Sequence, residues 1–163
     1  MVIINTEMRI QDAIFEVSEL QKDINRLRTE LYGGYHGPIA VNEKALETGY
    51  LKEKFDTEIQ TITEKIDRMS HLKAKIQQAN LEAKVEGLSV TESLVRVKEL
   101  RNIIQSLEMG YRGTRTEIEN VGAVRYGMFD DEYYQSILDG YRKEVTKISQ
   151  AIDLVNSTTY INI

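Results

Sequence analysis

Apolar residues recur with alternating spacings of three and four along the first part of the chain. The recurring positions are Ile10, Ala13, Val17, Leu20, Ile24, Leu27 and Leu31. This is the a/d pattern of a helix with one apolar stripe. It predicts a helix over residues 6–31, ended by "YGGYHGP" (residues 32–38), because glycine and proline favour backbone conformations outside a helix.

A second stripe predicts a helix over residues 43–85, with Asn42 as its N-cap. Lys73 interrupts the stripe, and Gly87 ends the helix. The apolar positions of this stripe are Phe55, Ile59, Ile62, Ile66, Met69 and Ile76. The next segment, "SVTE" (residues 89–92), has the spacing of a capping box, in which Ser89 and Glu92 satisfy each other's free backbone N–H groups.

Two further helices are predicted over residues 90–109 and 131–155, the second with Asp130 as its N-cap. Their stripes are Leu94, Val97, Ile104 and Leu107, and then Tyr134, Leu138, Tyr141, Val145, Ile148, Ile152 and Val155. The Gly-rich segment 110–129 between them has no helical stripe and is predicted as a loop, with "VGAVRYGMF" able to form a short hairpin. The tail "NSTTYINI" ends with apolar residues that can dock on the bundle or on a neighbouring subunit.

These patterns predict an all-α fold: an elongated four-helix bundle of long antiparallel helices in a single domain over residues 1–163. A helix of roughly 40 residues is about 60 Å long, which exceeds a compact domain of this size. Partner helices would cover the overhang and the regular seams, so we expect a homo-oligomer.

Composition narrows the function. The net charge of -5 disfavours a general nucleic-acid binder, which needs many Lys and Arg side chains to contact phosphates. The chain has no Cys, which excludes disulfides and thiolate metal sites and suits a reducing compartment. It has no stretch of about 20 apolar residues and no signal-peptide pattern at its start, so we expect a cytoplasmic protein without a membrane span. His71 has no metal-ligand partner at helical spacing, and we predict no metal, no cofactor and no enzymatic activity.

Residues 76–102 carry an Asn-Leu pair (Asn80, Leu81), a turn with Gly87, then Thr91, Glu92, Ser93 and Leu94 followed by Arg96. With "TRTEI" (residues 114–118) and "VNSTT" (residues 155–159), this pattern resembles the septicolysin-like family of small bacterial helical proteins. The resemblance implies an all-helical fold. The family name also implies a cytolysin, but the acidic balance of the chain does not favour a membrane-active protein.

The resembling stretches are polar and lie at predicted helix ends or in the 110–129 loop, where they suit a pocket for a small anionic, nucleotide-like ligand. Arginines grip phosphate or carboxylate in two-pronged fashion, tyrosines stack on bases, and amides and hydroxyls read ring edges. The candidate residues are Asn80, Thr91, Glu92, Arg96, Tyr111, Arg112, Arg115, Glu117, Tyr126, Asn156 and Thr158. The alternative is a structural polar network, in which Arg115 pairs with a nearby glutamate and Asn80 caps its own helix.

Three functional hypotheses follow. The first is a non-enzymatic oligomer that sequesters a nucleotide-like ligand, as small phage-encoded sponges do with immune signalling nucleotides. The second is a structural or adaptor oligomer whose seams engage partner helices. The third is a membrane-active toxin of the septicolysin kind.

Overall fold

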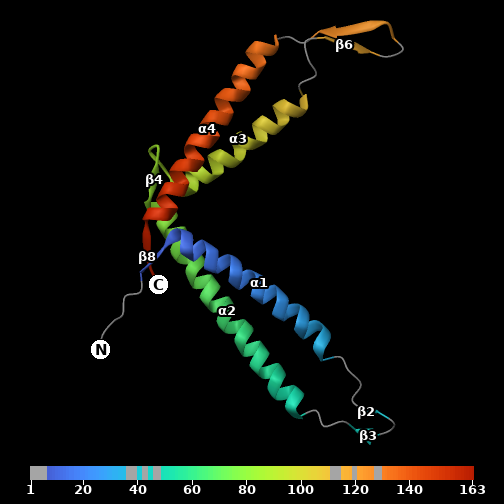
Figure 1. The fold of residues 1–163 in the computed structure, drawn as a ribbon, viewed down its shortest axis with the longest axis vertical. Coiled ribbons are helices and arrows are strands. Elements are labelled where there is room, and N and C mark those ends of the chain that lie inside the picture. The colour runs from blue at the N-terminus through green and yellow to red at the C-terminus, as the bar shows by residue number, and fades with distance from the viewer. Residues whose placement is uncertain are drawn as a thin grey trace. The chain divides into compact units, whose positions relative to one another are not determined.

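The computed structural model describes residues 7–35, 40–41, 44–45, 49–110, 115–118, 121–126 and 130–163. These residues form four long helices and four two-stranded antiparallel sheets (Figure 1), which confirms the all-α class. The chain divides into two compact units, residues 1–79 with 157–163, and residues 80–156. The sequence predicts one domain over the same residues.

The first unit is built on a helical hairpin, here called the first hairpin, of α1 (Ile10–Gly34) and α2 (Gly49–Glu82). Its base is a sheet of β1 (Glu7–Arg9) and β8 (Tyr160–Asn162), in which Met8 lies opposite Ile161. The short strands β2 (Ala40–Val41) and β3 (Lys44–Ala45) belong to the segment that connects α1 to α2 in the sequence, and they pair with each other. The core combines Ile10, Ala13 and Leu72 with Ile161 of the C-terminal strand.

The second unit contains the second hairpin, α3 (Val90–Gly110) and α4 (Asp131–Thr158). Its base is the sheet of β4 (Lys84–Val85) and β5 (Leu88–Ser89), joined by a turn in which Glu86 and Gly87 have φ of 51° and 86°. Two consecutive positive φ values are typical of the tight turns that match strand twist. Strands β6 (Arg115–Ile118) and β7 (Ala123–Tyr126) form a hairpin between α3 and α4.

The two units are repeats of one design. Met8-Arg9-Ile10 corresponds to Leu88-Ser89-Val90, and the backbone N–H of Ile10 donates to Thr159 O (3.0 Å) as that of Val90 donates to Ala83 O (3.1 Å). In the sheets, the Met8–Ile161 pair corresponds to the Leu88–Val85 pair. The core repeats too, because Leu72 corresponds to Ile148 and Ala13 to Ser93, and all four are buried.

The seams of α1 and α4 are confirmed as predicted, since every predicted position on them is buried or half-buried. On α3, the predicted Leu94 is exposed, and the seam uses the buried Ser93 instead. On α2, the prediction was right at Ile62, Met69 and Ile76, but Phe55 is exposed, and the positions predicted at Ile59 and Ile66 shift by one residue to Glu58 and Lys65. Leu72 rather than Lys73 is fully buried, so the apparent interruption at Lys73 disappears.

Helix ends depart from the prediction where backbone pairing competes with the helix. Residues 7–9 and 84–85 are strands rather than helix, and α2 begins at Gly49 instead of following Asn42, which lies outside the described residues. At the other ends α1 continues through Gly34 and α4 through Thr158. A short hairpin forms before α4 as predicted, but its strands are residues 115–118 and 123–126, so its first strand precedes the predicted "VGAVRYGMF" segment. The predicted docking of the tail is confirmed, because the tail pairs with β1 as β8.

Candidate functional site

The polar residues at the start of α3 form the predicted capping box. Glu92 Oε2 accepts hydrogen bonds from Ser89 N and Ser89 Oγ, both at 2.7 Å, and Ser89 Oγ accepts one from Glu92 N at 3.2 Å. These bonds from Ser89 to the carboxylate hold the pKa of Glu92 below its usual value. Thr91 lies between the two residues and is half-buried. The Glu92 carboxylate therefore caps the N-terminus of α3.

Arg96 is engaged with α4. Its Nε donates to Glu144 Oε1 at 2.8 Å, and Nη2 contacts the same oxygen. In the first hairpin, the corresponding residues are Glu16 and Arg68, and Arg68 Nε donates to Glu16 Oε1 at 2.8 Å. The interhelix ion pair is thus repeated with the charges exchanged. A ligand at Arg96 would have to compete with Glu144 for the guanidinium.

Asn80 and Asn156 are equivalent residues near the ends of α2 and α4, and both are half-buried. In each, the side-chain Oδ1 is buried and has no hydrogen-bond partner among the described residues. A buried amide oxygen is costly unless it is paired, so each position suits a bound water or a polar partner. Thr158, the last residue of α4, is exposed.

The remaining candidates belong to the β6–β7 region. Tyr111 and Arg112 lie outside the described residues. Arg115 lies opposite Tyr126 in the ladder, and Glu117 lies opposite Val124. The strand pairing therefore places two predicted binding residues, Arg115 and Tyr126, opposite each other, while Arg96 is paired with Glu144 of α4.

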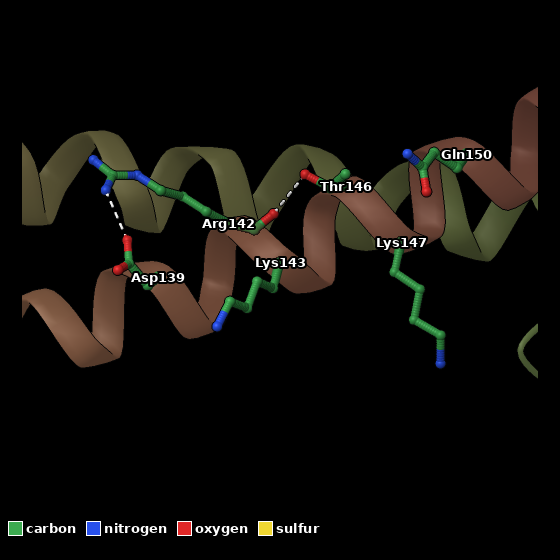
Figure 2. A pocket seen from close by; sticks show the side chains of 6 residues that line it. All are labelled: Asp139, Arg142, Lys143, Thr146, Lys147 and Gln150. Atoms are coloured by element: carbon green, nitrogen blue, oxygen red, sulfur yellow. Dashed lines mark hydrogen bonds and ion pairs between the residues drawn. The ribbon is translucent and has the colours of Figure 1, made fainter.

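Two open hollows lie on helix surfaces. One, of about 320 Å³, is lined by α4 residues that include Arg142, Lys143 and Lys147 (Figure 2). Arg142 pairs with Glu108 and Asp139, which raise its pKa, and Lys147 donates to Glu86 at 2.8 Å. The other, of about 430 Å³, is lined by Asn25, Arg28, Thr29 and Tyr32 of α1. Neither hollow brings together the polar residues predicted from the sequence.

Metal-ligand clusters and membrane spans are absent from the described ranges of the chain. These ranges contain no group of three His, Asp or Glu side chains placed to hold a metal ion. None of their helices has both the length and the apolar character needed to cross a bilayer.

Sequence reasoning missed the polar contacts between helices because it treated each helix alone. The signal was present, since "RIQDAIFEVSEL" (residues 9–20) aligns without gaps on "SVTESLVRVKEL" (residues 89–100). That alignment places Glu16 on Arg96 and shows that both belong to a repeated contact.

Comparison with known proteins gives no matching family model, no matching curated protein and no matching solved structure. The septicolysin-like resemblance stays a prediction.

Proposed function

We propose that the protein is a non-enzymatic helical assembly protein that self-associates through the surfaces of its hairpins. The observation that carries the proposal is the number of large apolar side chains that the two hairpins leave exposed. They include Ile14, Phe15, Phe55, Ile59, Ile66, Leu94, Val95, Ile103, Met109 and Ile137. A pair of helices can bury only one stripe of each helix, so large apolar side chains outside that stripe are available to a partner.

The polar contacts support this proposal because they cap helices and join neighbouring helices. Glu92 caps a helix, and Arg96 links two helices through Glu144. The repeat places the Glu16–Arg68 pair at the equivalent position of the other hairpin. A contact that recurs with its charges exchanged serves the pairing of helices, since an anion site would require the positive charge to stay in one place.

Sedimentation velocity of the full chain over a range of concentrations tests the proposal. We expect a species larger than the 18.8 kDa chain that dissociates on dilution. A single 18.8 kDa species at every concentration would overturn it.

A second candidate, binding of an anionic nucleotide, is favoured by one observation, the register that sets Arg115 opposite Tyr126. A guanidinium and an aromatic ring on neighbouring strands suit a phosphate and a base. Arg125 offers a matched control because it lies on the same ladder opposite Thr116.

Thermal unfolding with a panel of nucleotides tests this candidate. A bound nucleotide at 100 times its Kd stabilises the folded state by about 2.7 kcal/mol, which raises Tm by several degrees. The rise should persist in Arg125→Ala and vanish in Arg115→Ala. Unchanged melting of the unmodified protein with every nucleotide removes the candidate.

A further inference from the structure

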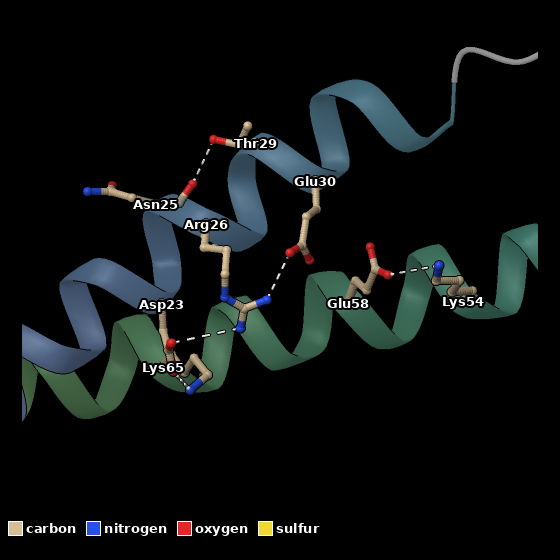
Figure 3. A network of polar contacts seen from close by, with 8 residues as sticks. All are labelled: Asp23, Asn25, Arg26, Thr29, Glu30, Lys54, Glu58 and Lys65. Atoms are coloured by element: carbon tan, nitrogen blue, oxygen red, sulfur yellow. Dashed lines mark hydrogen bonds and ion pairs between the residues drawn. The ribbon is translucent and has the colours of Figure 1, made fainter.

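The two flanks of the first hairpin differ sharply in chemistry. On one flank, Glu16 pairs with Arg68, and Asp23 pairs with Lys65 through a 2.6 Å contact. Figure 3 shows that Arg26 and Glu30 extend the same network along α1. Those neighbouring cations hold the pKa of Asp23 below its usual value, Lys65 contributing most.

The opposite flank, here called the Ile flank, has no ion pair among the described residues; its contact between two side chains is a hydrogen bond that Gln21 Nε2 donates to Asn25 Oδ1 at 3.3 Å. Ile14 of α1 and Ile59 and Ile66 of α2 lie on it, each about one position outside the buried seam. Their exposed fractions are 42%, 41% and 40%. The Ile flank comprises the residues on this side of both helices. They are Gln11, Ile14, Ser18, Gln21, Asn25 and Arg28 of α1, and Asp56, Ile59, Thr63, Ile66, Ser70, Lys73 and Gln77 of α2.

In the second hairpin, polar side chains on the equivalent flank contact each other across the two helices. There Arg142 contacts Glu108, and Arg101 Nη2 donates to Ser149 Oγ at 3.4 Å. The positions equivalent to Glu108 and Arg142 are Arg28 and Ile66 in the first hairpin, where no ion pair is chemically possible. Of the three apolar side chains on this flank, the second hairpin keeps one, Leu94 at the position of Ile14, and has Gln135 and Arg142 at the positions of Ile59 and Ile66.

Charge favours a second copy of the chain as the occupant. Two chains of net charge -5 repel each other, and the repulsion is weakest where acidic residues are few. The Ile flank carries two bases, Arg28 and Lys73, against one acid, Asp56. Because a two-fold interface joins the same patch of both copies, each patch supplies both a base and an acid to its partner.

The area of the Ile flank is close to that of one side of a stable protein interface. The Ile flank runs along residues 56–77 of α2, about 33 Å at 1.5 Å per residue, and spans two helices of about 10 Å each. Its projected area of ~650 Å² approaches the ~800 Å² that each partner of a stable protein complex loses. Two hairpins packed in this way present four helices around one core.

We propose that two copies of this chain pair Ile flank against Ile flank, burying Ile14, Ile59 and Ile66 of each. This inference rests on the proposed function, self-association, and names the surface that performs it. The second hairpin provides a matched control, since Gln135 is the residue equivalent to Ile59 and is exposed on its flank.

Sedimentation velocity of variants of the full chain tests the proposal. Ile59→Lys with Ile66→Lys places four ammonium groups in the paired flanks and should weaken the dimer at least 100-fold, since burying unpaired charge is costly. Gln135→Lys should leave the dimer unchanged. Helix content from circular dichroism should stay the same in all variants, because the substituted side chains are exposed.

Cross-linking gives a second readout that does not require the flank to be disrupted. The chain has no Cys, so one introduced thiol marks one position. With a short bis-maleimide, Ser70→Cys on the Ile flank should form covalent dimers, and the equivalent Thr146→Cys in the second hairpin should not.

The outcomes separate the two proposals. An unmodified protein that is monomeric at all concentrations overturns both, and the Ile flank then belongs to another partner. A dimer that persists in the double Ile variant, with Ser70→Cys uncross-linked, overturns the Ile flank and leaves self-association standing. A monomeric double variant, a dimeric Gln135→Lys and selective cross-linking at residue 70 support both.

Discussion

The first and second hairpins share their seams and the registers of their basal sheets, yet they differ in the residues beside the seam. Leu72 and Ile148 occupy the same buried position, and the Glu16–Arg68 contact recurs as Arg96–Glu144. Beside the seam, Ile66 stands where the second hairpin has the ion-paired Arg142. The residues that repeat are thus those that hold each hairpin together. The residues that differ, such as Ile66 and Arg142, lie on the surface to which we assign a separate role.

The largest expected effect is on the shared cores. Leu72→Ala removes a fully buried side chain and should lower the free energy of unfolding by about 2–5 kcal/mol. Ile148→Ala, at the equivalent position, should cost a similar amount. Urea unfolding followed by circular dichroism measures both. A near-zero effect of one variant would break the equivalence of the two cores.

Loss of a helix cap should have an effect of intermediate size, and the effect should differ between the two hairpins. Ser89→Ala removes the capping box of α3 and should cost about 0.5–2 kcal/mol. The equivalent Arg9 has no side-chain capping bond at the start of α1. Arg9→Ala should therefore destabilise less in the same urea experiment, and an equal loss would contradict this difference.

Acid should weaken the same capping box. The folded pKa of Glu92 is lowered by its bonds from Ser89, so its contribution is complete above the unfolded pKa, about 4.3, and is lost as pH falls through the folded pKa. Unfolding of Glu92→Gln should accordingly depend less on pH below that range than unfolding of the unmodified protein. Parallel curves for the two proteins would show that Glu92 does not contribute.

The smallest effect concerns the exchanged ion pair. Glu16 and Arg68 are partly exposed, so their coupling should be only about 0.2–1 kcal/mol. A double-mutant cycle measures it: Glu16→Arg and Arg68→Glu singly should each destabilise, and together they should recover most of the loss. This double variant reproduces the polarity of Arg96–Glu144. Failure of the recovery would mean that the orientation of the pair matters.

Periodicity was enough to predict the four helices and the seams of α1 and α4, and the spacing of Ser89 and Glu92 predicted the cap, because each depends on residues close in sequence. It was wrong at helix ends that become strands, since β1 pairs with β8 from the other end of the chain. On α2, Ile59 and Ile66 mimic a seam and hide Leu72, because an apolar row beside a seam has nearly the same period.

The candidate site was less predictable for a similar reason. Glu144, the partner of Arg96, lies 48 residues away in sequence, and no local pattern joins the two. Arg115 and Tyr126, both predicted as candidates in the 110–129 segment, lie opposite each other because a short hairpin pairs residues that are close in sequence. Whether they bind an anion stays a prediction.

Native mass spectrometry of the purified full chain tests the central claim most directly, because it reports subunit number and bound cargo together. Assembly through helix surfaces predicts twice the 18.8 kDa chain mass with no additional small molecule. An 18.8 kDa monomer, or a species that carries a discrete extra mass released on heating and lost in Arg115→Ala, would contradict it.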